Sequence, residues 1–167
     1  RRSMMNVIAV TLLSDSTLTT SQWNAFEKQF KEQYSMYNME FLRVDPTPVT
    51  VNISARVYLR QNASIQQVNS ELTAMIEEFF APKKGHLGYD VYKSDISDLL
   101  NGRNVNAPSE YLERSIEYCI IDSPTTDVVL PAKTYYCVLG DLNLTLEYTS
   151  RGGYQGRLDR SVTTATT

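Results

Sequence analysis

A strict alternation of apolar and polar residues occupies positions 49–60 and constrains the fold more than any other feature. Every odd-numbered residue in this stretch is apolar, and every even-numbered residue can face water. Successive side chains of a β-strand point to opposite faces of its sheet, so this pattern predicts one long strand. The apolar face consists of Val49, Val51, Ile53, Ala55, Val57 and Leu59. We therefore expect a sheet with one face on a core and the other open to solvent or to a polar partner.

The length and the start of this strand place it at the centre of the fold. At about 3.3 Å per residue it would extend over about 40 Å, so several shorter strands can pair with it. Pro46 and Pro48 cannot donate a hydrogen bond to a neighbouring strand, and they mark its entry.

The segment before the long strand predicts a β-α-β unit. Residues 6–13 and 39–44 are short, mainly apolar runs typical of strands. Between them, Thr19 to Gln22 fits a capping box, and a helix is expected to run from there to about residues 37–38. Its apolar stripe recurs at spacings of three and four residues: Trp23, Phe26, Phe30 and Tyr34. The chain enters a strand almost at once, which suggests a piece of a longer protein.

The segment after the long strand predicts a β-α-α-β-β unit. A second capping box at Ser64 opens a helix with the apolar stripe Ile65, Val68, Leu72, Met75, Ile76 and Phe79. Ser94 is expected to cap a third helix that ends at Leu100. Residues 104–109 read as a polar loop, 115–121 as a strand, and 142–149 as a last alternating strand.

The complete pattern predicts an α+β fold of two small subdomains, with helices packed on largely antiparallel sheets. The first subdomain covers residues 1–46, and the second, built on the strand 49–60, covers residues 47–150. Residues 151–167 have no amphipathic period and form either a flexible tail or an arm that docks on a neighbouring subunit.

Composition narrows the function classes. The net charge of −3 disfavours nucleic-acid binding driven by phosphate neutralisation, so we expect no nucleic-acid partner. The chain has no apolar run near 18 residues, so we expect no insertion into a membrane. Cys119 and Cys137, its only cysteines, lie in strand-like segments and are expected to be buried free thiols rather than a disulfide framework.

The residues of a catalytic or metal site are not apparent in the sequence. His86 is the only histidine and lies in a Lys-Lys-Gly-His-Leu-Gly loop, with Asp90 as its nearest candidate co-ligand. Both cysteines lie in strands, whereas thiols are activated at helix N-termini. The glycine-rich stretch at 152–156 does not match a phosphate-binding loop. The chain is therefore expected not to be an enzyme and to use no cofactor or metal.

The tyrosines indicate a surface for protein contacts. The chain has 11 of them, too many for the predicted core, and tyrosine is enriched at protein interfaces. Tyr58 falls on the polar face of the long strand, between Arg56 and Arg60. These three residues, together with Tyr154 of the terminal segment, are the candidate interface residues.

An ordered series of segments between about residues 6 and 149 resembles a known protein family. After the β-α-β unit come an Asp-Pro-Thr-Pro-Val entry at 45–49, the long strand and two helices. The series continues with a strand at 116–120, Ser-Pro at 123–124, Asp-Val-Val-Leu-Pro at 127–131, Val-Leu-Gly at 138–140 and the strand of Leu142, Leu144 and Leu146. This order is similar to the C-terminal part of the baseplate J-like proteins, the wedge components of contractile phage tails and related injection machines. The loop 101–114 is longer and more polar than the family pattern, and residues 151–167 have no counterpart.

The resemblance implies a structural role and supplies no catalytic residues. Members of the family are wedges that surround a central hub, join one another into a ring and couple the baseplate to sheath contraction. It implies contacts with other wedge proteins, self-association, contacts to hub or sheath, and a place in the virion after assembly in the host bacterial cytoplasm. Two alternatives stay open: a carbohydrate- or receptor-binding tail module, and a small α+β enzyme or ligand-binding domain.

Overall fold

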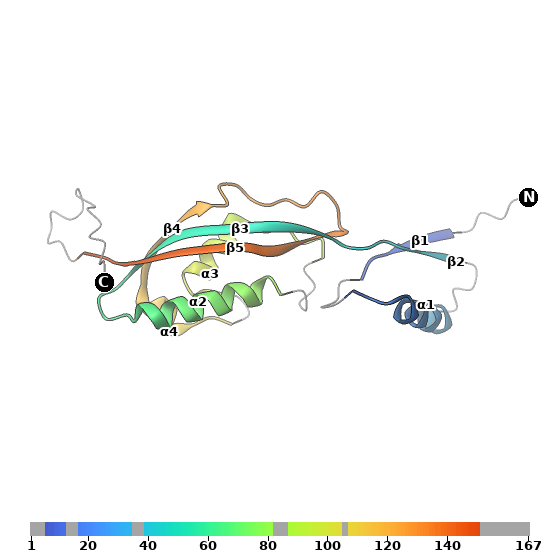
Figure 1. Ribbon diagram of the computed structural model, residues 1–167, viewed down its shortest axis with the longest axis horizontal. Coiled ribbons are helices and arrows are strands. Elements are labelled where there is room, and N and C mark those ends of the chain that lie inside the picture. Colours follow the sequence, from blue (N-terminus) through green and yellow to red (C-terminus); the bar gives the residue numbers. More distant parts are fainter. Residues whose placement is uncertain (1–5, 13–16, 35–38, 82–86, 105–106, 151–167) are drawn as a thin grey trace, which may run out of the picture.

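Two separate sheets, arranged one after the other, give the molecule its elongated shape (Figure 1). The computed structural model describes residues 6–12, 17–34, 39–81, 87–104 and 107–150. The first sheet contains β1 (Asn6–Val10) and β2 (Met39–Arg43), and the second has the strand order β4-β3-β5. The long central strand is β3 (Thr47–Leu59), flanked by β4 (Ile116–Ser123) and β5 (Tyr135–Tyr148). The α+β class expected from the sequence is confirmed.

The first sheet and helix α1 (Thr20–Tyr34) form the expected β-α-β unit. The capping box is present, because the Thr19 N–H donates to Gln22 Oε1 at 2.9 Å and the Gln22 N–H donates to Thr19 Oγ1 at 3.3 Å. The aromatic stripe of α1 packs against the sheet: Trp23 is buried, and the Phe30 ring lies edge-on to the Phe41 ring of β2. Residues 35–38, where we expected this helix to end, lie outside the described residues.

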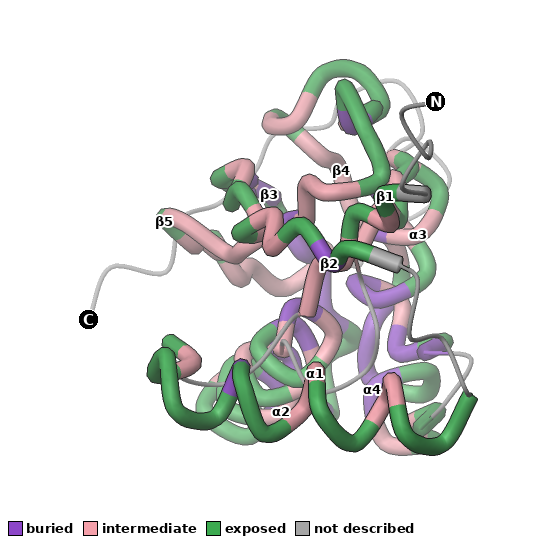
Figure 2. Tube along the Cα trace, turned by 90° about the vertical axis from the view of Figure 1, so that its right-hand side faces the viewer, coloured by how far each residue is buried: buried purple, intermediate pink, exposed green. Residues whose placement is uncertain are grey.

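The alternation along β3 is confirmed on its apolar face. Five of the six apolar residues are buried, and Val49 packs partly buried against the same core. The cover on this face includes α2 (Ile65–Phe79), whose Val68, Leu72 and Ile76 are fully buried. All members of this main core lie between Val49 and Tyr148 in the sequence. Trp23 and Phe41 are buried but are not among them, so they belong to a separate small core. Figure 2 shows the buried segments gathered between the sheet and the helices.

The start of α2 differs in one bond from the expected capping box. Ser64 Oγ accepts from the Gln67 N–H, as predicted, at 3.4 Å. The Gln67 side chain, however, donates to Glu71 of the next turn. The Ser64 N–H instead donates to the hydroxyl of Tyr111 at 3.1 Å, so a residue 47 positions along the chain completes the cap.

The start of α3 corrects the prediction of a Ser94 cap. The helix α3 (Lys93–Leu100) begins one residue before Ser94, and its N-cap is Tyr92. The Asp95 carboxylate accepts from the Tyr92 N–H at 3.0 Å, and a negative charge in the first turn is favoured by the helix dipole. The inward residues Ile96, Leu99 and Leu100 are buried as expected.

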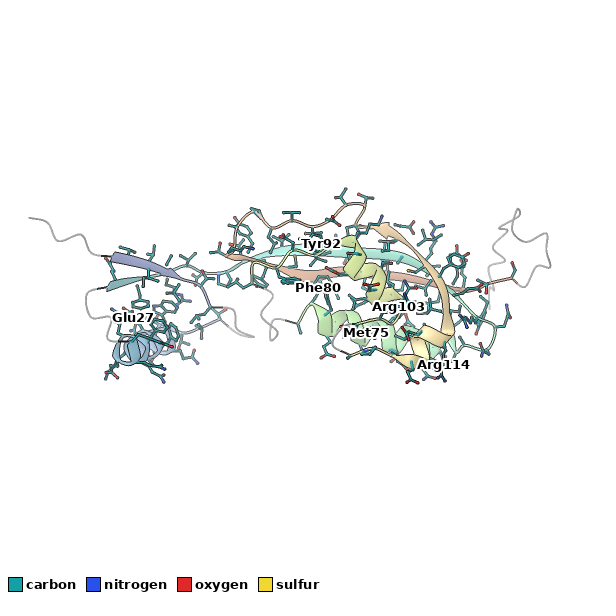
Figure 3. All side chains as sticks on the ribbon, turned by 180° about the vertical axis from the view of Figure 1, so that it is seen from behind. Glu27, Met75, Phe80, Tyr92, Arg103 and Arg114 are labelled. Carbon is teal, nitrogen blue, oxygen red and sulfur yellow. The ribbon has the colours of Figure 1, made fainter. Side chains whose placement is uncertain are left out.

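A short helix that we did not predict, α4 (Glu110–Ser115), precedes β4. Ser109 caps it by accepting from the Leu112 N–H at 3.3 Å, and Leu112 is fully buried. Arg103, just after α3, pairs with Glu113 of α4 at 3.3 Å. Figure 3 shows Arg103 and Arg114 on this helical layer, far from Glu27 of α1 at the other end of the molecule.

The smaller sheet is parallel and the larger sheet is mixed, whereas we expected largely antiparallel sheets. β3 pairs antiparallel with β4, but both β1 with β2 and β3 with β5 are parallel. The chain between β3 and β5 passes through three helices and β4, which is long enough to return β5 in the direction of β3. No described helix is long and apolar enough to cross a membrane.

β5 begins before the alternating strand 142–149 that we predicted, and a bulge lies within it. The register with β3 shifts between Val51 and Ile53, opposite Gly140. Here Asn52 Oδ1 accepts from the Asp141 N–H at 2.9 Å. A Cβ atom on Gly140 would lie only 2.1 Å from that same oxygen, so the close approach of the two strands requires glycine.

Candidate interaction surface

The helices α2, α3 and α4 lie on one side of the three-stranded sheet, and no described helix covers the other side (Figures 1 and 2). Polar and aromatic residues of all three strands meet on this open face. One row across the sheet contains Ile120, Arg56 and Thr145, and the next contains Tyr118, Tyr58 and Glu147. The candidate interface residues of β3 therefore lie beside partners from β4 and β5 that are distant in the sequence.

Arg56 is exposed and makes a two-pronged ion pair. Its Nε donates to Asp122 Oδ2 at 3.0 Å and its Nη2 donates to Asp122 Oδ1 at 2.8 Å. The hydrogen bond and the charge of Asp122 raise the pKa of Arg56 above its ordinary value. Both side chains stay more than 40% exposed, at 45% and 43%, so the pair is available to a partner and contributes little to stability.

Tyr58 is not the exposed contact residue that we predicted. Only 5% of it is accessible, because its ring stacks on Tyr118 at a centroid distance of 4.4 Å and an interplanar angle of 19°. The alternation placed Tyr58 on the correct face, but a large ring on the neighbouring strand covers it. Tyr118 is therefore the more accessible ring of the pair.

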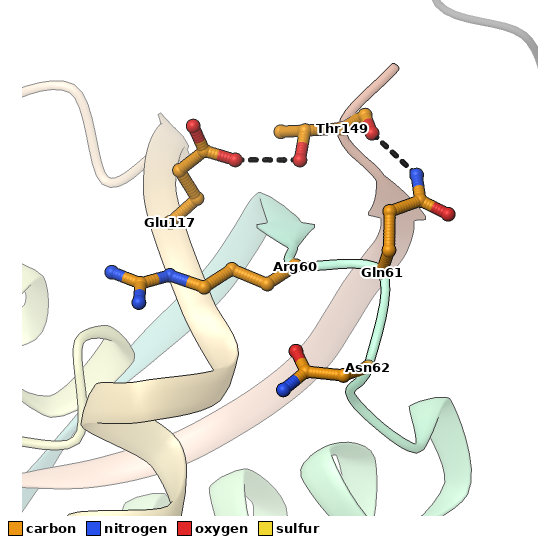
Figure 4. Close-up of a pocket in the computed structure, with 5 residues that line it drawn as sticks. All are labelled: Arg60, Gln61, Asn62, Glu117 and Thr149. Carbon is orange, nitrogen blue, oxygen red and sulfur yellow. Dashed lines mark hydrogen bonds between the residues drawn. The ribbon is translucent and has the colours of Figure 1, made fainter. Parts of the chain in front are cut away.

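Arg60 lies at the end of β3, beside a pocket of about 640 Å³ (Figure 4). All the lining residues are polar: Arg60, Gln61, Asn62, Glu117 and Thr149. Gln61 Nε2 donates to the Thr149 carbonyl at 2.6 Å, and the Thr149 hydroxyl donates to Glu117. Arg60 is exposed and forms no ion pair with the described residues, so its guanidinium is available to a carboxylate of a partner.

One carboxylate on the open face is incompletely bonded. Glu147 lies beside Tyr58 in the register of β5 with β3, and its Oε2 atom is buried. That atom has no hydrogen-bond partner within the described part of the chain. A buried acceptor without a donor is costly, so this position favours a partner that donates a hydrogen bond.

The thiols agree with the prediction that they are free and shielded. Cys137 is buried and Cys119 is partly buried, and neither forms a disulfide. Burial raises the pKa of both thiols, which lowers the fraction of reactive thiolate at neutral pH. Among the described residues no three His, Cys, Asp or Glu side chains gather closely enough to hold a metal ion. His86 and Tyr154 lie outside the described residues, so their predicted roles stay predictions.

The partners of the candidate residues could not be located from the sequence. Tyr118 lies in the stretch 115–121 that we predicted as a strand, and Asp122 follows it in what we predicted as a turn but is part of β4. The register of this strand against β3 was not predictable. Glu117 of β4 and Thr149, which follows β5, meet at the pocket just past the end of the central strand β3.

No protein-family model matches the chain, and a search of curated proteins finds no match either.

Proposed function

We propose that the protein is a structural component of a contractile tail baseplate, a wedge protein that acts through protein–protein contacts. The order of segments from the β-α-β unit to the leucine strand, which resembles the baseplate J-like proteins, is the basis for the family. The role is assembly and the coupling of the baseplate to sheath contraction, in a virion put together in the bacterial cytoplasm.

The observation that carries the proposal is the open face of the β4-β3-β5 sheet. One face of this sheet holds the core, and the other face carries Arg56 and Tyr118. With the exposed Arg60 just past the end of β3, this surface is suited to contact with another protein. Arg56 and Asp122 supply both signs of charge, and Tyr118 supplies an aromatic surface. Arg60 supplies guanidinium donors that form no ion pair within the described ranges of the chain. These groups recognise a polar, partly acidic surface, which is the kind of partner we propose for the neighbouring wedge, hub or sheath subunit.

The elongated arrangement of the two sheets also supports a wedge. The β-α-β unit lies beyond one end of the larger sheet, and only residues 44–46 separate β2 from β3. A molecule of this shape can contact different neighbours at its two ends. That is what a component needs if it joins adjacent wedges and also reaches a hub or sheath.

Removal of the coding sequence from its genome tests this role. We expect electron micrographs to show tail tubes and sheaths without complete baseplates, and we expect the wild-type sequence supplied in trans to restore them. Supplied in the same way, Arg60→Glu should restore them poorly, because it places a carboxylate where a partner carboxylate would bind. Asn69→Glu, an exposed change on α2, is the matched control and should restore them fully. Intact, contracting tails after the removal would contradict the proposal.

A further inference from the structure

The outer edge of β5 is unpaired from Leu142 to Tyr148 in the described part of the chain, whereas at the start of the strand the Tyr135 carbonyl accepts from the Gly88 N–H at 2.7 Å. β5 has 14 residues, and β3 is the strand with which it pairs. Figure 2 shows β5 at the side of the sheet, with no described element beyond it. The edge contains no lysine or proline, the residues that most often protect such edges. Its free N–H and C=O groups can therefore hydrogen-bond to a further strand.

The leucines of β5 provide a second, independent indication. They point to the side of the helices and pack against the core, yet each remains only partly buried: Leu142, Leu144 and Leu146. The corresponding residues of the central strand, Ala55 and Val57, are 1% and 0% exposed. An additional strand beyond β5 that carries large apolar side chains on this side would bury the remaining leucine surface.

We propose that a second copy of this chain pairs with this edge, β5 against β5 in antiparallel orientation around a two-fold axis. The result is one continuous six-stranded sheet, with the helices of both copies on the same side. This inference deepens the proposed function and rests on it, since it identifies the surface through which the wedge protein associates with itself. A two-fold contact uses the same patch on both copies, so the patch must be complementary to itself.

The charges of β5 select the register of this pairing. With Thr145 opposite Thr145 of the second copy, Leu144 lies opposite Leu146, and Asn143 lies opposite Glu147. An amide then faces a carboxylate, and no like charges are opposed. With Leu144 opposite itself, Asp141 would face Glu147 and repel it. We therefore propose the register centred on Thr145.

The sequence of residues 151–167 argues against that segment as the strand that covers β5. It continues directly from the end of the described chain, but its only large apolar side chains are Tyr154, Leu158 and Val162. Its last seven residues, Ser-Val-Thr-Thr-Ala-Thr-Thr, cannot offer a row of large side chains to the leucines of β5. A second β5 offers three leucines at the correct spacing.

Sedimentation velocity over a concentration series tests the proposal on the full chain. We expect a reversible dimer. Thr145→Lys should raise its dissociation constant at least tenfold, because two lysines then meet at the two-fold axis. Asn69→Lys adds the same charge to an exposed position on α2 and should leave the dimer unchanged. Circular dichroism checks that each variant is folded, and Asn143→Glu, which places a second carboxylate opposite Glu147 on each side of the axis, replaces Thr145→Lys if that variant does not fold.

Hydrogen exchange and a truncation make the test decisive. Amides of residues 142–148 should exchange more slowly at high protein concentration than at low concentration. A monomer at every concentration, or a dimer that survives both Thr145→Lys and Asn143→Glu, overturns the proposal. A full chain that is monomeric but dimerises after truncation at Ser150 also overturns it, because the terminal segment would then be the natural cover of β5. None of these results bears on whether baseplates form without the protein, so this inference can fail while the proposed function stands.

Discussion

The rings of Tyr58 and Tyr118 stack across β3 and β4 with their centroids 4.4 Å apart. This stack lies on the face of the sheet away from the helices, where Tyr58 would otherwise be open to solvent. The stack therefore buries a large ring outside the main core and holds β4 against β3 beyond the backbone ladder. Tyr58, which we predicted to contact a partner, instead supports the more accessible ring of Tyr118.

Replacement of Tyr118 by alanine should destabilise the fold. The change removes the stack and exposes Tyr58, and we expect a loss of about 1.5 kcal/mol in the free energy of unfolding. Urea denaturation followed by circular dichroism measures the loss. Tyr118→Phe keeps the ring and is the matched control, for which we expect a change below about 0.5 kcal/mol. Equal losses in the two variants would show that the hydroxyl group, rather than the stack, is important.

Removal of the Tyr111 hydroxyl should weaken the start of α2. In Tyr111→Phe the Ser64 N–H loses its acceptor at 3.1 Å, and we expect a destabilisation of about 0.5–1 kcal/mol. Tyr34→Phe on α1 removes a hydroxyl from a side chain that is exposed and is the control, with an expected change near zero. Amide exchange at residues 64–68 should accelerate in the first variant alone. An unchanged exchange rate there would mean that the Ser64 side chain is a sufficient cap.

The sequence predicted those parts of the fold that depend on local patterns. The alternation of β3 and the stripe of α2 arise from the periodicity of single elements, and both hold in the structure. The α4 helix was missed because its six residues are too few for a periodic stripe, although Ser109 is a good N-cap residue. The parallel pairing of β3 with β5, the Tyr118 cover on Tyr58 and the Arg56–Asp122 pair depend on register between distant segments. A pattern within one segment contains no information on that register.

The two thiols should make stability fall at alkaline pH. Burial raises the pKa of Cys119 and Cys137 in the folded state, so the unfolded chain loses its thiol protons at lower pH than the folded chain. The unfolded state then binds fewer protons, and the free energy of unfolding decreases as the pH rises through the unfolded thiol pKa of about 8.5. Urea denaturation at pH 7 and pH 9.5 measures the decrease. Cys137→Ser should make the decrease smaller, because a serine hydroxyl does not titrate there. A decrease of the same size in Cys137→Ser would exclude that thiol as the cause.

Addition of a methyl group at Gly140 should strain the bulge between β3 and β5. In Gly140→Ala the new Cβ meets Asn52 Oδ1, and the Asn52 side chain must move and release the Asp141 N–H. We expect a destabilisation of about 1–3 kcal/mol, since a donor loses its acceptor and two strands are forced apart. Thr145→Ala, farther along the same strand, is the matched control and should cost less than about 1 kcal/mol. In an Asn52→Ala background the oxygen is absent, so the additional cost of Gly140→Ala should be smaller than in the wild type. If that cost is the same in both backgrounds, the contact with Asn52 is not the reason for glycine at this position, and the nearby Thr50 methyl group becomes the cause.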